Sequence, residues 1–229
     1  VKEAKKLGMT VIVTDHHEVP FEETDGVKHY MLPDADAIVD PKQIDCTYPF
    51  KSLCGTGVAY QLMRLLFRKM NQKMKREDVF LQYTAIATVA DVMELVGENR
   101  ILVRIGLSYL NHTEHVGLHA LMEVCGISPE QIKAYHIGFI LGPCFNAAGR
   151  LDTIVHALAL LEEKNHEKAL ALAQELWAMN EERKELTRVG TERAVEIIEH
   201  ASWKDERVYL VYIPDCHESV AGIIAGRLR

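Results

Sequence analysis

The stretch Met9–Pro20, with the sequence MTVIVTDHHEVP, decides how this chain folds. It begins with a short apolar, β-branched run, Met9–Val13, that has no polar alternation. Such a run is typical of a strand that is buried on both faces of a parallel sheet. A helix is expected to end at Leu7 and Gly8 just before it, and Pro20 excludes regular structure after it. The sequence therefore predicts the α/β fold class, a parallel sheet flanked by helices.

Three side chains that can bind a metal or move protons, Asp15, His16 and His17, follow this strand directly. In open α/β sheets, ligands bind beyond the carboxyl ends of the strands. The alternative is an ordinary loop in which Asp15 caps the next turn. Two adjacent histidines on an extended chain would also point to opposite faces, so a shared site requires the chain to turn here. On their own, these residues favour a metal or phosphate site and a capped loop about equally.

Composition narrows the class of protein. Hydrophobic residues make up 48% and charged residues 26% of the 229 residues, which suits a globular protein with one large core. No apolar run is long enough to span a bilayer, and no signal-peptide pattern is present. The five cysteines form no CxxC pair and favour reduced thiols in a cytoplasmic protein. The net charge of −7 argues against a basic nucleic-acid coat protein, but not against an enzyme whose acidic residues hold divalent metals.

The next elements are expected to build the rest of this domain. Phe21–Tyr30 is acidic and is predicted to be a loop, and Ala35–Val39 is predicted to be a second short strand. Apolar residues recur in helical rhythm within Lys51–Asn71, which predicts a helix. Gly55 and Gly57 at its start would let a phosphate approach the helix N-terminus, but tight packing against the sheet is the commoner reason for such a pair.

A second helix is predicted over Glu77–Val92, with Asp91 in its apolar last half. A carboxylate in apolar surroundings is costly unless it is paired or bound to a cation. Alone, Asp91 is better explained as a helix-end residue that reaches water. With His16 and His17 available, a metal shared by all three side chains becomes the better account.

The stretch GPCFNAAGRLD, residues 142–152, has too many small residues to pack much apolar area of its own. Small residues let another molecule's backbone approach Asn146 and Arg150, and arginine offers a planar fork for phosphate. The alternative is a tight helix–helix contact with Arg150 in an internal ion pair. We prefer the phosphate contact.

The last third of the chain combines a long helix with the start of another element. An apolar stripe over Glu167–Ala201 predicts a helix long enough to connect two domains. Arg207–Ile213, RVYLVYI, is predicted to be a strand, and a glycine-containing helix is predicted after His217. Arg227 in that helix is a candidate anion contact.

Four motifs in this order resemble the DHH phosphoesterase family: TDHH, ATVADVMEL, GPCFNAAGRLD and HESVAGIIAGRLR. The SLCGTGVAY and MNEERKEL segments extend the resemblance over essentially the whole chain. Within the family, the match is to the exonucleases that degrade single-stranded DNA from 5′ to 3′. The resemblance implies hydrolysis of phosphodiester bonds with Mn²⁺ or Mg²⁺, in a site that holds two metal ions in the complete protein.

The resemblance also implies a role for each candidate residue. His16 and Asp91 would bind metal. His17 would face the scissile phosphate or a metal-bound water, and Asp15 would orient its neighbours. The nucleic-acid and phosphate contacts would be Asn146, Arg150, Arg227 and His217. The implied domains are the C-terminal part of a DHH domain (1–160), a connector helix (161–205) and the beginning of a DHHA1 domain (206–229).

The chain departs from the family pattern at several points. Cys144 stands where arginine is common, and Gly226 stands where serine is common. The family's first two acidic motifs are absent, and Lys2–Leu7 resembles the back half of a helix, so the chain is expected to begin in mid-domain. Those motifs supply much of the metal site. We therefore expect the chain alone to be inactive or nearly so.

Two other functions remain open. One is a DHH phosphodiesterase or phosphatase that acts on nano-RNA, pAp or cyclic dinucleotides, although such enzymes carry a GGGH-like element where this chain has GIIAGRL. The other is a non-catalytic DHH-fold binding protein. The expected partners are single-stranded DNA and a helicase or single-strand-binding protein, in the cytoplasm, with no membrane.

Overall fold

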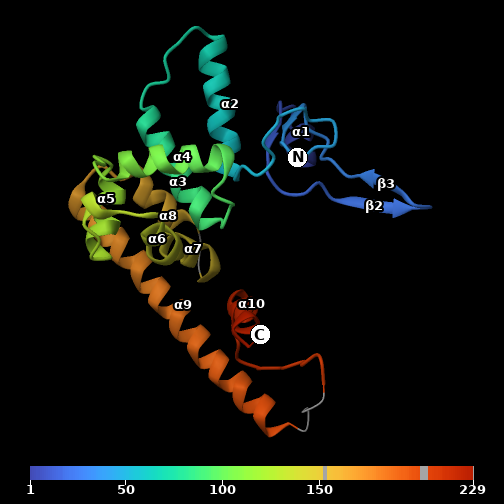
Figure 1. The fold of residues 1–229 in the computed structure, drawn as a ribbon, viewed down its shortest axis with the longest axis vertical. Helices are drawn as coiled ribbons and strands as arrows, with labels where there is room; N and C mark the ends of the chain where they lie inside the picture. The colour runs from blue at the N-terminus through green and yellow to red at the C-terminus, as the bar shows by residue number, and fades with distance from the viewer. Residues whose placement is uncertain (152–153, 202–205, 229) are drawn as a thin grey trace. The chain divides into compact units, whose positions relative to one another are not determined.

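The computed structural model describes residues 1–151, 154–201 and 206–228 (Figure 1). None of the helices in these ranges is long and apolar enough to cross a membrane. The chain folds as two compact units. The first comprises Val1–Thr113 and Pro129–Gly138, and the second comprises Glu114–Ser128 and Phe139–Arg229.

The strand predicted at the beginning of the first unit forms, but it is short and exposed. Helix α1 (Lys2–Lys6) ends as predicted, and β1 (Ile12–Thr14) pairs in parallel with β4 (Ala37–Val39). Over the described residues this sheet has two strands, so β1 has a neighbour on one side, and Ile12 is 61% exposed. The parallel pairing is confirmed, whereas burial of the strand on both faces is wrong for this structure.

Residues 21–30 form a β-hairpin, so the prediction of a loop is wrong. Strand β2 (Phe21–Thr24) pairs antiparallel with β3 (Val27–Tyr30). Asp25 and Gly26 connect them with φ angles of 53° and 75°. Two left-handed residues in succession are what a tight two-residue hairpin turn requires, and Asp-Gly is a preferred pair for it. The sequence contained this signal, but the acidic composition of the stretch concealed it.

Three helices complete most of the first unit, and two of them were predicted. They are α2 (Gly55–Lys69), α3 (Glu77–Ala90) and α4 (Gly97–Leu110). Helices α3 and α4 pack closely because Gly106 has no side chain: a Cβ there would collide with the Leu81 carbonyl oxygen. The remaining short turns are η1 (Pro129–Gln131), α6 (Ala134–His136) and the π-helical η2 (Ile137–Leu141).

The second unit is built around one long helix, drawn in orange in Figure 1. This helix, α9 (His166–His200), confirms the predicted helical tract and has 35 residues. Its first part packs against three shorter helices, and its later part packs against α10. These are α5 (Val116–Val124), α7 (Gly142–Leu151), α8 (Val155–Glu162) and α10 (Glu218–Arg227).

The small-residue stretch 142–152 forms α7, apart from Asp152, which lies outside the described residues. Cys144, Ala147 and Ala148 are fully buried, so the small residues serve tight helix packing. The same helix leaves Asn146 and Arg150 exposed. The tight helix packing is confirmed, whereas the internal ion pair of Arg150 is not found among the described residues, where Arg150 bonds to the Ser219 backbone carbonyl. The phosphate contact of Asn146 and Arg150 stays a prediction.

The strand predicted over Arg207–Ile213 does not form in the described chain. The apolar side chains of this segment are divided between solvent and the protein. Val208, Leu210 and Tyr212 are exposed, whereas Val211 and Ile213 pack on the core shared by α9 and α10. A strand requires a hydrogen-bonded neighbour, and no described segment pairs with this one.

Candidate functional site

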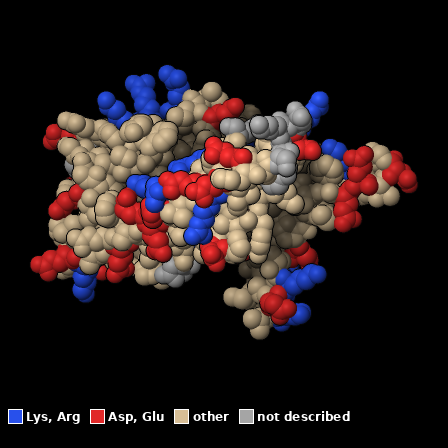
Figure 2. All heavy atoms as spheres, turned by 90° about the horizontal axis from the view of Figure 1, so that it is seen from below, with Lys and Arg blue, Asp and Glu red and all other residues tan. Residues whose placement is uncertain are grey.

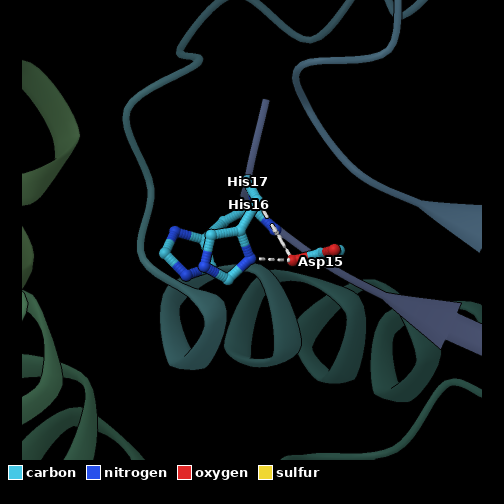
Figure 3. Close-up of side chains that lie close together, drawn as sticks. All are labelled: Asp15, His16 and His17. Carbon is cyan, nitrogen blue, oxygen red and sulfur yellow. Dashed lines mark hydrogen bonds and ion pairs between the residues drawn. The ribbon is translucent and has the colours of Figure 1, made fainter. Parts of the chain in front are cut away.

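The chain turns at the end of β1, so that two adjacent imidazole rings lie together. Figure 3 shows the rings of His16 and His17 on the same side of the strand end, with Asp15 beside them. The ring centroids are 4.3 Å apart, and Asp15 Oδ1 lies 2.7 Å from His17 Nδ1. Asp15 Oδ1 also accepts hydrogen bonds from the backbone N–H groups of His16 at 2.7 Å and His17 at 3.2 Å. These hydrogen bonds stabilise the turn that places both rings on one side, whereas an extended chain would point them to opposite faces.

Asp15 is held as an anion by the same contacts. Partial burial by itself would raise its pKa, but the hydrogen bonds from His16 and His17 outweigh burial and lower the pKa below its usual value. A carboxylate only accepts hydrogen bonds, so Nδ1 of His17 must carry the proton that it donates to Asp15. In a neutral imidazole with its proton on Nδ1, Nε2 has the lone pair that can bind a metal or accept a proton.

Asp91 joins this group from the end of α3. It is the C-cap residue, and its Oδ2 lies 3.7 Å from His16 Nε2. Its side chain is 48% exposed, whereas that of His16 is 17% exposed. Asp91 therefore reaches water at a helix end and also faces a histidine, so the two roles considered for it are compatible.

The first residue of α2 packs against the ring of His16. Gly55 is the first residue of this helix, and a Cβ built there would lie 3.3 Å from His16 Cδ2. The N-cap residue, Cys54, is buried, and its Sγ atom lies 3.4 Å from both the Gly57 nitrogen and Thr88 Oγ1. Because Thr88 lies in α3 one turn before Asp91, this contact ties the start of α2 to the helix end that carries the acid.

A strained residue marks the end of α3. Val92 has a φ angle of 56°, and its N–H bonds to the Val89 carbonyl while the next N–H, of Met93, bonds back to Thr88. This pattern is a helix C-terminal motif that usually has glycine in the left-handed position. A β-branched residue there costs energy, and the strain fixes the point at which the helix stops beside Asp91.

These four side chains fit a divalent cation. One ligand atom from each of Asp15, His16 and His17 lies within 4.8 Å of the other two, and Asp91 extends the set toward α3. A mixture of imidazole and carboxylate ligands, such as His16 and Asp91, suits Mn²⁺.

The other candidate residues lie in the second unit, two of them at the beginning of α10. Arg150 Nη1 donates a hydrogen bond of 2.7 Å to the backbone carbonyl of Ser219. His217 is the N-cap of α10, where its Nδ1 accepts from the Ser219 backbone N–H and lies 2.7 Å from Ser219 Oγ. The structure thus brings Arg150 and His217 together at one helix N-terminus. Asn146 and Arg227 are both exposed, on α7 and α10.

Arg183 is a functional candidate that the sequence analysis did not single out. Partial burial, followed by the nearby positive charges of Arg150 and Arg227, lowers the pKa of its guanidinium. The side chain is fixed by two hydrogen bonds to Asn180 Oδ1, of 3.0 and 3.2 Å, and Asn180 is itself buried. The MNEERKEL segment contained both residues, but a charged residue on a long helix is usually a solvated one. Arg150, Arg183 and Arg227 together are called the arginine cluster below.

The positive charge of the arginine cluster is confined to a small part of an acidic protein. Figure 2 shows acidic and basic side chains mixed over one face of the described chain, in keeping with the net charge of −7. Arg183 feels the positive charges of both Arg150 and Arg227, and such a local concentration of positive charge attracts an anion even in an acidic protein.

Comparisons with known proteins identify similar sequences and folds. Residues 1–88 match the DHH family, N-terminal domain. The whole chain is 39% identical to the single-stranded-DNA-specific exonuclease RecJ of Salmonella typhimurium, of which it spans 40%. It is 37% identical over 99% of its length to RecJ of Bacillus subtilis, of which it spans 27%. The chain thus covers well under half of these relatives.

Solved structures show the same fold. A RecJ from Thermus thermophilus in complex with Mn²⁺ superposes with a TM-score of 0.80 and 28% identity, over 99% of this chain and 32% of that one. An exonuclease RecJ bound to manganese superposes with a TM-score of 0.79 and 29% identity, over 99% of this chain and 54% of that one. The predicted α/β class, a small parallel sheet flanked by helices, is confirmed.

Proposed function

We propose that this chain, whose first 88 residues match the DHH family, is part of a metal-dependent exonuclease that degrades single-stranded DNA from 5′ to 3′. The observation that carries the proposal is the approach of His16 Nε2 to Asp91 Oδ2, at 3.7 Å, beside the paired His17 and Asp15. Relatives with this sequence pattern are named as exonucleases, and two similar structures contain Mn²⁺.

Mn²⁺ or Mg²⁺ would be held by His16 and Asp91, and when bound would activate water and stabilise charge on the phosphoryl oxygens. The protein's own part is positioning. Asp15 holds His17 in one orientation and one tautomer, so that its Nε2 faces the reacting phosphate and can take up a proton. Gly55 leaves room for the His16 ring at the helix start.

The arginine cluster would bind the DNA backbone. Arg150 uses one donor on Ser219 and has others free for a phosphate oxygen, because a guanidinium has five N–H donors. Arg183 is held in place by Asn180, and it meets a phosphate without a further loss of side-chain freedom. Arg227 would bind the 5′ end of the strand. Asn146 and the N-cap residue His217 would contribute polar contacts.

The test measures the hydrolysis of four substrates by the complete protein, of which this chain is a part, in the presence of Mn²⁺. The substrates are a 5′-phosphorylated single-stranded oligonucleotide, its duplex, a dinucleotide and pAp. We expect nucleotides to be released from the single strand only, and we expect His16→Ala and Asp91→Asn to abolish the release. Faster hydrolysis of the dinucleotide or of pAp would assign the chain to the small-substrate phosphodiesterases instead. Binding of DNA without Mn²⁺-dependent hydrolysis of any substrate would indicate a non-catalytic DHH-fold protein.

The remaining proposals concern context. We propose a cytoplasmic protein that works with a helicase or a single-strand-binding protein, since an exonuclease of this kind needs single-stranded ends. We also keep the division into a DHH domain, a connector helix and the start of a DHHA1 domain. The connector would be α9, which alone spans 35 residues.

A further inference from the structure

A second group of metal-binding side chains lies in the second unit, on α5 and α9. His119 and Glu123 are one turn apart on α5, and His166 is the first residue of α9. One ligand atom from each of the three residues lies within 4.8 Å of the other two. His166 Nε2 is 3.2 Å from Glu123 Oε2, and the rings of His119 and His166 have centroids 6.2 Å apart.

The spacing of these residues suits a metal better than it suits an ion pair. Residues four apart on a helix point to the same side, so His119 and Glu123 offer two ligands from one face of α5. Bonds of about 2.0–2.1 Å arranged tetrahedrally separate ligand atoms by about 3.3 Å. The contact between Glu123 and His166, at 3.2 Å, already has this separation. An ion pair would need only Glu123 and His166. A metal site also accounts for His119, whose ring lies beside them.

The helices that carry the ligands are fixed, whereas the ligands themselves can adjust. On α5, Leu118, Ala120 and Leu121 are essentially fully buried, and on α9 so is Ala169. Helix α5 also packs beside the beginning of α9 (Figure 1). The side chains of His166 and Glu123 are 53% and 51% exposed. They can therefore move by the small distance that closes a coordination sphere, and water can supply the fourth ligand.

We propose that His119, Glu123 and His166 form a zinc-binding site that fastens α5 to the beginning of α9. Two neutral imidazoles and one carboxylate are a ligand set that binds Zn²⁺ with an open fourth position. Glu123 lies in the last turn of α5, where the negative end of the helix dipole favours a cation. The N-terminus of α9 carries a partial positive charge that repels a cation. The negative charge of the Glu123 carboxylate offsets this repulsion.

The test uses the purified chain with the cluster in the first unit removed by His16→Ala and Asp91→Asn. Zn²⁺ is titrated in competition with a chromophoric chelator. We expect one equivalent of zinc to bind, and we expect His119→Ala, Glu123→Gln and His166→Ala each to weaken its binding at least tenfold. The matched control is His200→Ala, an exposed histidine at the other end of α9. It should leave zinc binding unchanged.

Two further measurements locate the ion. Zinc at about a hundred times its dissociation constant should raise the unfolding midpoint by roughly 5–10 °C, and His119→Ala should remove that shift. Cobalt(II) in place of zinc should show visible absorption without a sulfur-to-metal charge-transfer band. That band would place the ion on a cysteine and overturn the proposal. So would a chain that binds no zinc, or one whose zinc survives all three substitutions. None of these measurements depends on exonuclease activity, so the two proposals can fail separately.

Discussion

His16 Nε2 and Asp91 Oδ2 lie 3.7 Å apart, although 91 − 16 = 75 positions separate the two residues in the chain. The contact joins the end of strand β1 to the end of helix α3, and helix α2 packs against both elements. Both elements stop at these residues for local reasons: Asp15 turns the chain after β1, and the left-handed Val92 ends α3. The candidate metal centre thus depends on where β1 ends and where α3 ends.

Asp91→Asn should weaken Mn²⁺ binding by the first unit at least tenfold. The substitution keeps the shape of the side chain but removes the negative charge that a hard cation prefers. Titration calorimetry with Mn²⁺ measures the change, and Asp45→Asn, at an exposed position of the same unit, is the matched control. Equal affinities in the two variants would remove Asp91 from the metal site.

Gly55→Ala should displace the His16 ring and weaken Mn²⁺ binding while α2 stays folded. The added methyl group would lie 3.3 Å from His16 Cδ2, closer than an ordinary contact, so the ring must give way. The imidazole resonances of His16 report the displacement directly. Gly222→Ala adds the same methyl group to α10 in open space and should leave these resonances unmoved.

Val92→Gly should stabilise the protein by about 0.5–1 kcal/mol. Glycine adopts the left-handed conformation freely, and this gain exceeds the extra backbone entropy that glycine loses on folding. The φ angle of 56° and the 87% exposure of Val92 mean that little packing is lost. Urea unfolding measures the change. Val195→Gly, inside α9 and five residues before its end, should have the opposite sign, because glycine is a poorer helix former than valine.

Arg227→Gln should reduce the salt dependence of binding to single-stranded DNA. Each phosphate contact on a single strand contributes about 0.7 to the slope of log K against log salt, so the slope should fall by about that amount. Fluorescence anisotropy of a labelled oligonucleotide at several salt concentrations measures it. Arg188→Gln is the control, because Arg188 is already paired with Glu185 and Glu192 on α9. An unchanged slope for Arg227→Gln would exclude this residue from the DNA contact.

The contact between Lys5 and Asp36 should make part of the stability depend on pH. The hydrogen bond from Lys5, and then that from the Val11 backbone N–H, lower the pKa of Asp36. A depressed carboxyl pKa adds stability above the unfolded-state value of about 3.9, and this stability is lost as the pH falls through the lower, folded value. The free energy of unfolding should therefore differ between the unchanged chain and Asp36→Asn at pH 7, and the difference should shrink toward pH 3. A constant difference would contradict this origin.

Much of the fold is encoded locally. Helices α2, α3 and α9 begin and end within a few residues of their predicted limits, because helical periodicity is a property of consecutive residues. The position of Asp15, His16 and His17 at a strand end was also evident from the sequence, since a β-branched run that stops abruptly at polar residues is typical of a strand and its end.

Other features required the tertiary structure. The segment 207–213 has the apolar composition of a strand, but it has no neighbour to pair with and forms no strand in the described chain. Arg183 resembled a solvated helix residue until burial beside Asn180 and the charges of Arg150 and Arg227 identified it as part of a cluster.

The sequence by itself identified Asp15, His16, His17 and Asp91 as candidate metal-binding residues and placed them at the ends of a strand and a helix. Only the tertiary structure decided which of them meet, such as His16 with Asp91 in one unit and Arg150 with Ser219 in the other. The physical reason is that helix and strand propensities act between neighbouring residues. A distance between remote side chains is instead set by how whole elements pack.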